Sequence, residues 1–379
     1  MTVAAIPSPT NAVWEIGPVP IRAYALCIIL GIILAGVVTE FRLRQRGAHK
    51  WAILDIAVWA VPFGIIGARI YHVITSPGQY FGEGGDPLEA LQVWKGGLGI
   101  WGAVAGGAVG ALLAARQLGM PLTVVADALA PGLPLAQAVG RLGNWFNNEL
   151  YGRQTTLPWG LEVHEMDSAG RPTLVDGEAV LRPGLYHPTF LYELVWNVLV
   201  AGLVLALDRK FKFGRGRAFA LYVMGYTLGR FFIEMMRDDT ATHIAGVRIN
   251  VFVAALVFVG ALAYFLKVRG PREYLIPVGV DAPVPAPRGG DISTVDVSAK
   301  PAATAAIPSS YRVVDEEQFH AYQATGVVPD GDAVPDSNDN ATAKAESDGE
   351  SDAAEVEADE DGQDSDTTAA GAGGRADDR

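Results

Sequence analysis

Residues 21–41 read IRAYALCIILGIILAGVVTEF, an apolar run whose only charges, Arg22 and Glu40, lie near its two ends. At 1.5 Å per residue, a helix of this length crosses the roughly 30 Å hydrocarbon core of a bilayer. Further stretches of sufficient length and apolarity lie near residues 52–75, 97–115, 122–139, 189–207, 218–236 and 249–267. The sequence therefore predicts an all-α polytopic membrane protein with seven transmembrane helices.

Charge divides the chain into two unlike parts. Residues 1–272 carry 18 acidic and 23 basic residues, a net charge of +5, whereas residues 273–379 carry 24 acidic and 6 basic residues, a net charge of −18. From about Pro271 onward, Pro, Ala, Asp, Glu, Ser and Gly dominate without helical or strand periodicity, and such a composition buries too little apolar surface to fold alone. We predict a membrane domain over residues 1–272 and a disordered acidic tail over residues 273–379.

Basic residues indicate how the predicted spans are oriented. They cluster after the first, third, fifth and seventh spans, at Arg42, Arg44, Arg46 and Lys50, at Arg116, at Arg209, Lys210, Lys212, Arg215 and Arg217, and at Lys267, Arg269 and Arg272. By the positive-inside rule these loops face the cytoplasm, which places the N-terminus outside and the tail in the cytoplasm. Because the first 21 residues contain no Lys or Arg, we expect no cleaved signal peptide.

The fourth span and the segment after it depart from a plain helix and a plain turn. Asp127, Pro131 and Pro134 interrupt a short apolar run, as in a broken or kinked helix. About 49 residues then precede the fifth span, and they are too polar to lie in the membrane. Their Gly, Pro and alternating segments predict a small external subdomain with short strands within residues 140–188.

Ionisable residues within the predicted spans share one depth. Such residues are costly in hydrocarbon and usually functional. Arg69 in the second span and Arg230 in the sixth lie about 9 Å inside the external edge, and the polar residues nearer that edge are Tyr24, Glu193 and Glu234. Arg141 and Glu149 follow the external end of the fourth span. Polar groups gathered at one depth indicate a pocket, whereas a conduction path needs them staggered across the membrane.

One face of the sixth span carries a surplus of positive charge. Arg230, Glu234 and Arg237 are spaced i, i+4 and i+7, so they share a helix face that must meet other polar groups or a charged ligand. A guanidinium fork matches the oxygens of a phosphate, and this depth suits an anionic phospholipid head group. The sequence thus favours a lipid-handling enzyme, although a structural ion-pair network is the alternative for any single residue.

Residues 140–152, GRLGNWFNNELYG, carry the most specific motif in the chain. The string resembles the signature of the prolipoprotein diacylglyceryl transferases, with Gly-Arg, Gly-Asn, Asn, Glu and Gly at matching spacing. Four further matches follow the order of that family: IRAYAL around Tyr24, VWKGGLGIWG at 93–102, HPTFLYE at 187–193 and GYTLGRFFIEMMR at 225–237. The resemblance covers residues 20 to about 269, including the seven helices, and leaves out the tail.

The resemblance implies a reaction and its substrates. Members of this family transfer the diacylglyceryl group from phosphatidylglycerol to the thiol of the lipobox cysteine in a prolipoprotein signal peptide, forming a thioether and releasing glycerol phosphate. The reaction implies no metal and no cofactor, and no nucleic-acid partner is expected. It implies a multi-pass protein of the bacterial cytoplasmic membrane with its active site toward the outer leaflet.

The resemblance also implies roles for individual residues. Arg141 and Arg230 match phosphate-binding arginines of the family, which suits cations placed where charge develops on a leaving phosphate. Asn144 matches a position that donates a hydrogen bond to a lipid oxygen. Gly152 matches a glycine where a side chain would obstruct close approach, although a simple turn requirement explains it equally well.

Two carboxylates and a tyrosine complete the matches to the family. Glu149 and Glu234 either orient an arginine, the interpretation we favour, or accept the thiol proton if burial raises the pKa of the carboxyl. Tyr24 contacts the head group in this interpretation, the alternative being an interfacial tyrosine. Arg69 and Arg237 are expected to add positive charge to the same substrate-binding pocket.

One position departs from the family pattern. Most members carry a histidine, proposed as the base, where this chain has Trp101, and an indole nitrogen donates a hydrogen bond but accepts no proton at neutral pH. His187, at the start of the fifth span, is either a substitute for that base or a structural histidine. We expect Trp101 and His187 to belong to the substrate-binding residues. We assign no general base, because a thiol with a pKa near 8.5 is already partly thiolate at neutral pH and nearby arginines increase that fraction.

Other classes of protein remain to be tested. A polytopic transporter for an anionic solute is the main alternative, since spans with Pro, Gly and internal charges also describe transporters. A receptor or scaffold acting through its acidic tail is a third possibility. A soluble acyltransferase mechanism has little support, because the sole cysteine, Cys27, lies in the first apolar run and is best explained as a packing residue.

Overall fold

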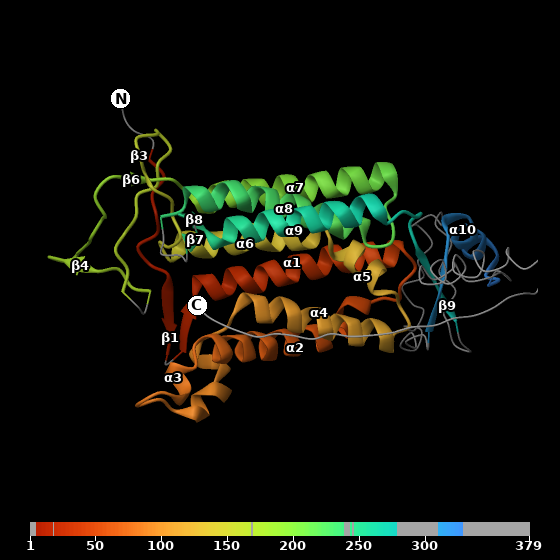
Figure 1. Ribbon diagram of the computed structural model, residues 1–379, viewed down its shortest axis with the longest axis horizontal. Coiled ribbons are helices and arrows are strands. Elements are labelled where there is room, and N and C mark those ends of the chain that lie inside the picture. Colours follow the sequence, from red (N-terminus) through yellow and green to blue (C-terminus); the bar gives the residue numbers. More distant parts are fainter. Residues whose placement is uncertain are drawn as a thin grey trace, which may run out of the picture. The chain divides into compact units, whose positions relative to one another are not determined.

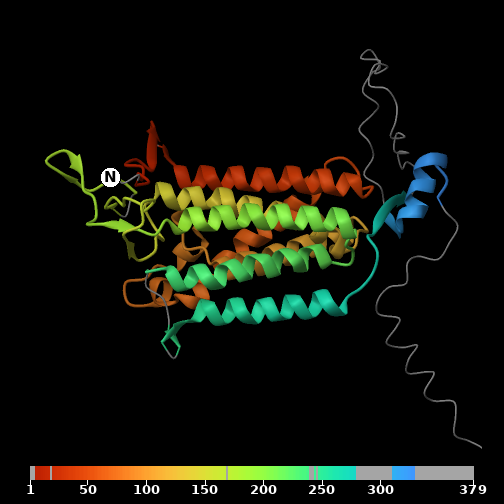
Figure 2. The same cartoon turned by 90° about the horizontal axis from the view of Figure 1, so that it is seen from above.

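The computed structural model is mostly helical, with long helices lying side by side (Figures 1 and 2). It describes residues 5–17, 19–167, 170–238, 243–244, 246–278 and 310–328. The long helices and the two parts of the broken one are α1 Ala23–Gln45, α2 Ala52–Thr75, α4 Ile100–Gln117, α5 Leu122–Leu129, α6 Gly132–Phe146, α7 Thr189–Phe211, α8 Arg217–Met236 and α9 Ile249–Lys267. We call the end of these helices at which α1 begins and α6 ends the motif end, and the opposite end the tail end.

Four described helices, α1, α2, α7 and α9, are long and apolar enough to cross a membrane. The pair α5 and α6 is a fifth candidate, bent by 46° at the break around Pro131. The predicted interruption of the fourth span is therefore confirmed, and α6 continues through Arg141 and Asn144 rather than ending before them. The structure supports four to five spans, so the total of seven stays a prediction.

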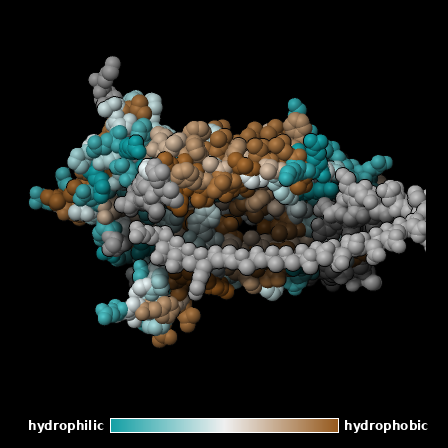
Figure 3. All heavy atoms as spheres, viewed as in Figure 1, coloured by the Kyte–Doolittle hydropathy of each residue, from teal (hydrophilic) through white to brown (hydrophobic). Residues whose placement is uncertain are grey.

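The outward surface of the helices is apolar along their middle. Figure 3 shows hydrophobic residues over the central part of the helices and hydrophilic ones toward both ends. Large side chains such as Ile33, Val58 and Leu256 are exposed. A surface of this kind is unfavourable in water and favourable against lipid tails, as expected of an integral membrane protein.

Glycines allow α2 and α4 to pack closely. Gly102, Gly106 and Gly110 recur every fourth residue and so share one face of α4. A Cβ added at these positions would lie 2.1, 2.2 and 2.5 Å from backbone oxygens of α2, those of Gly67, Phe63 and Trp59. Because only glycine leaves room for this approach, the contact is of the small-residue type common between membrane helices.

Short elements gather at the motif end. The hairpin of β1 Val13–Ile16 and β2 Val19–Arg22 is antiparallel, with Val13 opposite Arg22. Between α2 and α4 lie α3 Gly78–Phe81, η1 Pro87–Leu91 and η2 Val93–Lys95. Between α6 and α7, β3 Gln154–Thr155 pairs with β6 Leu185–Tyr186, and β4 Leu174–Val175 pairs with β5 Glu178–Ala179. The pair β7 His243–Ile244 and β8 Val247–Arg248 precedes α9.

The prediction of an entirely disordered tail from residue 273 is wrong for two segments. β9 Tyr274–Val278 pairs antiparallel with β10 Ser310–Val314, and α10 Glu316–Thr325 follows behind a capping box at Asp315. Leu275 is fully buried, and its backbone N–H donates to the carbonyl oxygen of Arg46 at 2.7 Å. These short apolar stretches pack on the membrane domain, so they need not fold alone. The rest of the predicted tail lies outside the described residues.

Candidate functional site

Arg141 and Arg230, which are 89 positions apart in the sequence, meet on one carboxylate at the motif end. Arg141 Nε lies 2.5 Å from Glu193 Oε2, and Arg230 Nη1 lies 3.2 Å from Glu193 Oε1. The three side chains come from α6, α7 and α8. Glu193 thus joins three helices, and it holds the two arginines at one place.

A second carboxylate extends this contact to α9. Glu234 is fully buried, with Oε2 2.5 Å from Arg230 Nη2 and 3.9 Å from Arg237 Nη1. Its other oxygen, Oε1, lies 2.8 Å from Arg248 Nε and accepts a 3.0 Å hydrogen bond from Asn250 Nδ2. Both charged neighbours of Arg230 are therefore carboxylates fixed by other residues.

A third branch of the site runs along the motif of residues 140–152. Arg141 Nη1 donates to Asn144 Oδ1 at 3.2 Å, and Asn144 Nδ2 donates to Glu149 Oε1 at 2.9 Å. Asn147 Nδ2 also donates to that oxygen, at 3.1 Å. Because α6 ends at Phe146, the chain turns back here and presents Glu149 to its last helical turn. The motif is therefore one hydrogen-bonded unit that orients Arg141.

Together these residues form what we call the motif-end network, with four arginines and three glutamates: Arg141, Arg230, Arg237, Arg248, Glu149, Glu193 and Glu234. The side chains of Arg141 and Arg230 are 20% and 18% exposed, whereas Glu193 and Glu234 are buried. Glu149 is exposed as well, so the accessible part of the network carries two guanidinium groups and one carboxylate. A small anion that reaches Arg141 and Arg230 meets two guanidinium groups held by the buried Glu193.

A pocket adjoins the network between α7 and α8. Its volume is only about 10 Å³, room for about one water-sized group, and its lining residues are Glu193, Trp196, Asn197, Tyr226, Gly229, Arg230 and Ile233. On α8 these residues recur at i, i+3, i+4 and i+7, the spacing of a single helix face. The pocket places the Glu193–Arg230 ion pair beside a space between two helices.

Arg69 and Trp101 are not brought into the motif-end network. Arg69 donates to four backbone carbonyls of the segment between α2 and α4, those of Glu89, Ala90, Gly96 and Gly97. Its guanidinium also lies 4.9 Å from the ring centre of Tyr80. Trp101 is half exposed in the first turn of α4. Arg69 thus fastens a connecting segment, which is a structural role.

Tyr24, Gly152 and His187 lie at the motif end in packing positions. The Tyr24 ring covers Gly143, where an added Cβ would lie 2.6 Å from Tyr24 Cδ2. A Cβ at Gly152 would lie 2.8 Å from His187 Cβ and 2.9 Å from Met236 O, so a glycine is required where this segment passes α7 and α8. His187 Nδ1 lies 3.3 Å from the Tyr192 hydroxyl.

Sequence reasoning missed two members of the network as site residues. In the sequence, Glu193 is a polar residue near the external edge and the last residue of the HPTFLYE match, and neither feature gives it a role in the site. Arg248 precedes the seventh apolar stretch and therefore resembles a loop residue in the sequence. Neither contact is visible from spacing along one helix, because each joins residues of different elements.

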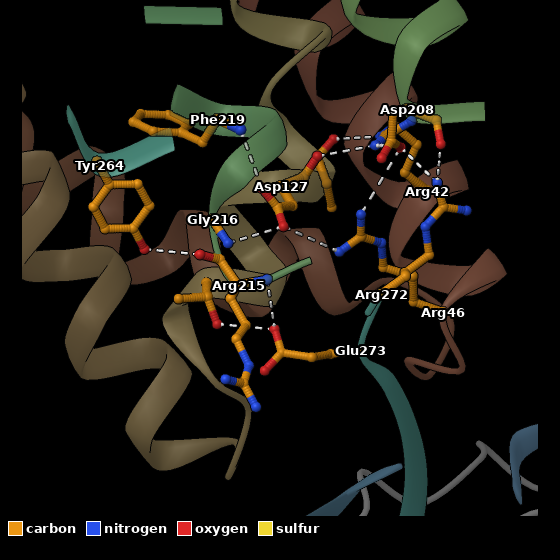
Figure 4. Close-up of polar contacts among 12 residues, drawn as sticks. Arg42, Arg46, Asp127, Asp208, Arg215, Gly216, Phe219, Tyr264, Arg272 and Glu273 are labelled. Carbon is orange, nitrogen blue, oxygen red and sulfur yellow. Dashed lines mark hydrogen bonds and ion pairs between the residues drawn. The ribbon is translucent and has the colours of Figure 1, made fainter. Parts of the chain in front are cut away.

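A different ionic cluster, which we call the tail-end network, lies at the other end of the helices (Figure 4). Asp208 Oδ2 lies 2.7 Å from Arg42 Nη2, 2.9 Å from Arg272 Nη2 and 4.0 Å from Arg46 Nη2. Arg46 is also 3.9 Å from Asp127, and burial lowers the pKa of Arg46 to about 10 although the charge of Asp127 opposes this shift. The cluster ties α1, α5 and α7 to the segment after α9.

The tail-end network also fixes the backbone. Arg42 donates to the carbonyl oxygens of Asp127 and Ala128, both at 3.0 Å. Asp127 accepts 3.0 Å hydrogen bonds from the backbone N–H groups of Gly216 and Phe219, at the start of α8 (Figure 4). The charged side chains here satisfy backbone groups at the break between α5 and α6 and at a helix start, as structural residues do.

Known proteins resemble this chain over its membrane part. A sequence model of the family described as "Prolipoprotein diacylglyceryl transferase" matches residues 11–267. The phosphatidylglycerol–prolipoprotein diacylglyceryl transferase of Nocardia farcinica is 57% identical over 289 residues, 75% of this chain and 59% of that protein. Its namesakes from Rhodococcus jostii and Mycobacteroides abscessus are 57% and 54% identical, over 72% of this chain and 77% and 81% of their own lengths.

The apolar helices and the buried network at their motif end define an integral membrane protein with a polar site set among its spans. The match covers well over half of the residues, and several relatives exceed 50% identity. The chain belongs to the prolipoprotein diacylglyceryl transferase family. The family resemblance indicated by residues 140–152 is thereby confirmed.

Proposed function

We propose that this protein transfers the diacylglyceryl group of phosphatidylglycerol to the thiol of a prolipoprotein's lipobox cysteine. The observation that carries the proposal is the meeting of Arg141 and Arg230 on Glu193, in a chain of this family. Both arginines keep part of their guanidinium accessible while a carboxylate fixes their position. This is the arrangement that recognition of a phosphodiester requires.

The reaction makes defined demands on these two arginines. The cysteine thiolate attacks the glycerol carbon next to the phosphate, a C–S bond forms, and the C–O bond to the phosphate breaks. The electron pair of that bond stays on the departing glycerol phosphate, and the thiol proton goes to solvent or to this phosphate. Arg141 and Arg230 stabilise the added negative charge, and cations held in place beforehand do so without reorganisation.

The glutamates act as positioning residues in this proposal. Glu193 and Glu234 each bind Arg230 at a fixed oxygen, and Glu149 reaches Arg141 through Asn144. A carboxylate engaged in two or more such contacts is a poor proton acceptor, so we assign none of them as general base. The thiolate fraction present near neutral pH, increased by the cationic surroundings, supplies the nucleophile.

We infer seven membrane spans in the bacterial cytoplasmic membrane, with α4 and α8 among them. The basic clusters 42–50, 209–217 and 267–272 all lie at or after tail-end helix ends. The positive-inside rule then puts the tail end in the cytoplasm and the motif end toward the outer leaflet, where secreted precursors arrive. The partly polar face of α8 is explained by its contacts within the motif-end network.

The direct test combines purified protein, phosphatidylglycerol vesicles and a lipobox peptide. Mass spectrometry should show the peptide gaining one diacylglyceryl group, and a peptide with Ser in place of the lipobox Cys should gain none. Absence of the adduct would overturn the proposal. If Arg141→Ala and Arg230→Ala instead altered the flux of an anionic solute in proteoliposomes, the protein would be a transporter.

A further inference from the structure

Asn197 is a buried polar residue that the proposed reaction leaves unexplained. It lies on α7, is 2% exposed, and its Oδ1 has no hydrogen-bond partner among the described residues. Buried amide oxygens are almost always paired, because an unmet acceptor loses its hydration without compensation. We expect such an oxygen to meet a donor that lies outside the described residues, either a water or a hydroxyl of a ligand.

The surroundings show where such a donor would come from. Asn197 lines the pocket between α7 and α8, together with Glu193 and Arg230. It follows Glu193 by four residues, so it lies on the same helix face, about 6 Å deeper along the helix axis. The unpaired oxygen is therefore about one helical turn from the ion pair expected to meet the phosphate.

The pocket walls are fixed in place. Trp196 Nε1 donates to the carbonyl oxygen of Gly225 at 2.8 Å, which holds the indole against α8. Gly229 makes this possible, since a Cβ there would lie 2.1 Å from Trp196 Nε1. A space bounded by a fixed indole, a glycine and the buried side chain of Ile233 holds its shape before a ligand arrives.

The chemistry of the lining selects the kind of group that enters. Glu193 and Asn197 offer acceptor oxygens, the Tyr226 hydroxyl can donate or accept, and Arg230 is the only cation among the lining residues. Ester carbonyls of a lipid carry no donor, so they cannot satisfy Asn197 Oδ1. The glycerol head group of phosphatidylglycerol carries two hydroxyls a few bonds from its phosphate, and each hydroxyl can donate.

We infer that Asn197 Oδ1 accepts a hydrogen bond from a hydroxyl of this head group while Arg230 binds the adjoining phosphate. The inference rests on the proposed function and adds to it a residue that determines lipid specificity. A hydroxyl is about the size of a water, so it fits the small space between α7 and α8, while the rest of the head group and the acyl chains stay outside it. A site built to bind a hydroxyl rejects analogues without one, because its own polar atom then stays unpaired.

The test compares two lipids that differ only in these hydroxyls. Phosphatidylglycerol and phosphatidylethanol with the same acyl chains carry the same single negative charge, and only the first has head-group hydroxyls. For each protein variant, kcat/KM for transfer to a lipobox peptide is measured with both lipids. Where turnover of phosphatidylethanol is too slow, its inhibition constant against phosphatidylglycerol replaces it. The ratio within one variant cancels differences in folded fraction.

We expect the unchanged protein to prefer phosphatidylglycerol and Asn197→Leu to lower this preference about tenfold, through loss of kcat/KM for phosphatidylglycerol. Asn197→Asp keeps an acceptor oxygen in place and should keep the preference. Gln137→Leu is the matched control, because Gln137 also has a buried oxygen without a hydrogen-bond partner in the described part of the chain but does not line the pocket. Its lipid preference should stay unchanged.

Two outcomes overturn the inference. If Asn197→Leu lowers kcat/KM equally for both lipids, or raises only the KM for the peptide, the missing donor belongs to the precursor's backbone rather than to the head group. If the preference stays unchanged, Asn197 takes no part in lipid choice. Failure of the unchanged protein to modify the peptide with either lipid would instead refute the proposed function.

Discussion

The motif-end and tail-end networks are built from the same residue types, yet Arg141 and Arg230 differ from Arg42 in their partners. At the tail end, Arg42 contacts Asp208 and also donates to backbone carbonyls of α5, and Asp127 accepts from backbone N–H groups at the start of α8. At the motif end, the contacts of Arg141 and Arg230 are with side chains, on Glu193, Glu234 and Asn144. A guanidinium that satisfies backbone groups cannot leave them without breaking the fold, whereas one held by side chains can share its donors with a ligand.

The same distinction separates the predicted site arginines from one another. Arg69 shares the membrane depth of Arg230 in the sequence, but its donors all reach backbone oxygens of residues 89–97. Arg69 therefore resembles Arg42 of the tail-end network, which also donates to backbone oxygens. The depth of a polar residue in the membrane shows only that it needs a partner. Whether that partner is the backbone or a side chain indicates whether the residue is structural.

The largest effect is expected from Arg141→Gln, measured as transfer of the diacylglyceryl group to a lipobox peptide. Removing one preorganised charge from a developing oxyanion typically lowers the rate by about 10²–10³-fold. Glu193 keeps its contact with Arg230, so the thermal unfolding temperature in detergent should change little. A variant that unfolds readily but retains its activity per folded molecule would place Arg141 with the structural arginines.

Asp208→Ala should produce the converse result. It leaves Arg42, Arg46 and Arg272 without their shared carboxylate, and breaking a buried ion pair from one side costs about 3–5 kcal/mol of folding free energy. We expect a much lower unfolding temperature and unchanged kcat/KM for the molecules that remain folded. Full stability together with lost transfer would show that the tail-end network serves the reaction.

Leu275→Ala tests whether residues after α9 belong to the membrane domain. Leu275 is fully buried in a cluster with Leu43, Ala115 and Met120, so truncation should cost about 2–4 kcal/mol through lost burial and a residual cavity. The readout is thermal unfolding of the purified protein. A chain that ends after Val328 keeps every described element and should match the full chain in both stability and transfer. If Leu275→Ala were as stable as the parent, the membrane domain would end at residue 272, as the sequence predicts.

Much of the fold could be predicted from the sequence because apolar length is a local property. The stretches that became α1, α2, α7 and α9 are visible by counting, and the break at Pro131 is visible from its proline. The short strands after residue 273 were not predicted. YLIPV and SYRVV lie in an acidic, proline-rich region, and their stability comes from packing against α1 and the turn before α5 rather than from their own composition.

The candidate site was only partly predictable for a related reason. Spacing along α8 brought Arg230, Glu234 and Arg237 together correctly, because i, i+4 and i+7 lie on one face. The contacts of Glu193 with Arg141 and of Glu234 with Arg248 join separate elements, and no pattern within one helix encodes them. Family resemblance supplied Arg141 but gave no partner for it.

The smallest expected effect concerns a surface ion pair at the tail end. Lys212 Nζ donates to both oxygens of Glu316 at 2.6 Å, and this hydrogen bond holds the pKa of Glu316 below its usual 4.5. A carboxyl with a lowered folded-state pKa contributes stability above its unfolded pKa and loses it as the pH falls through the folded value. Because the pair is exposed, its contribution should stay below about 1 kcal/mol.

Between pH 6 and pH 4 the unfolding temperature of the parent should therefore fall slightly more than that of Glu316→Gln. Identical pH profiles would mean that this contact, unlike the buried pairs of either network, adds nothing to the stability of α10 on the membrane domain.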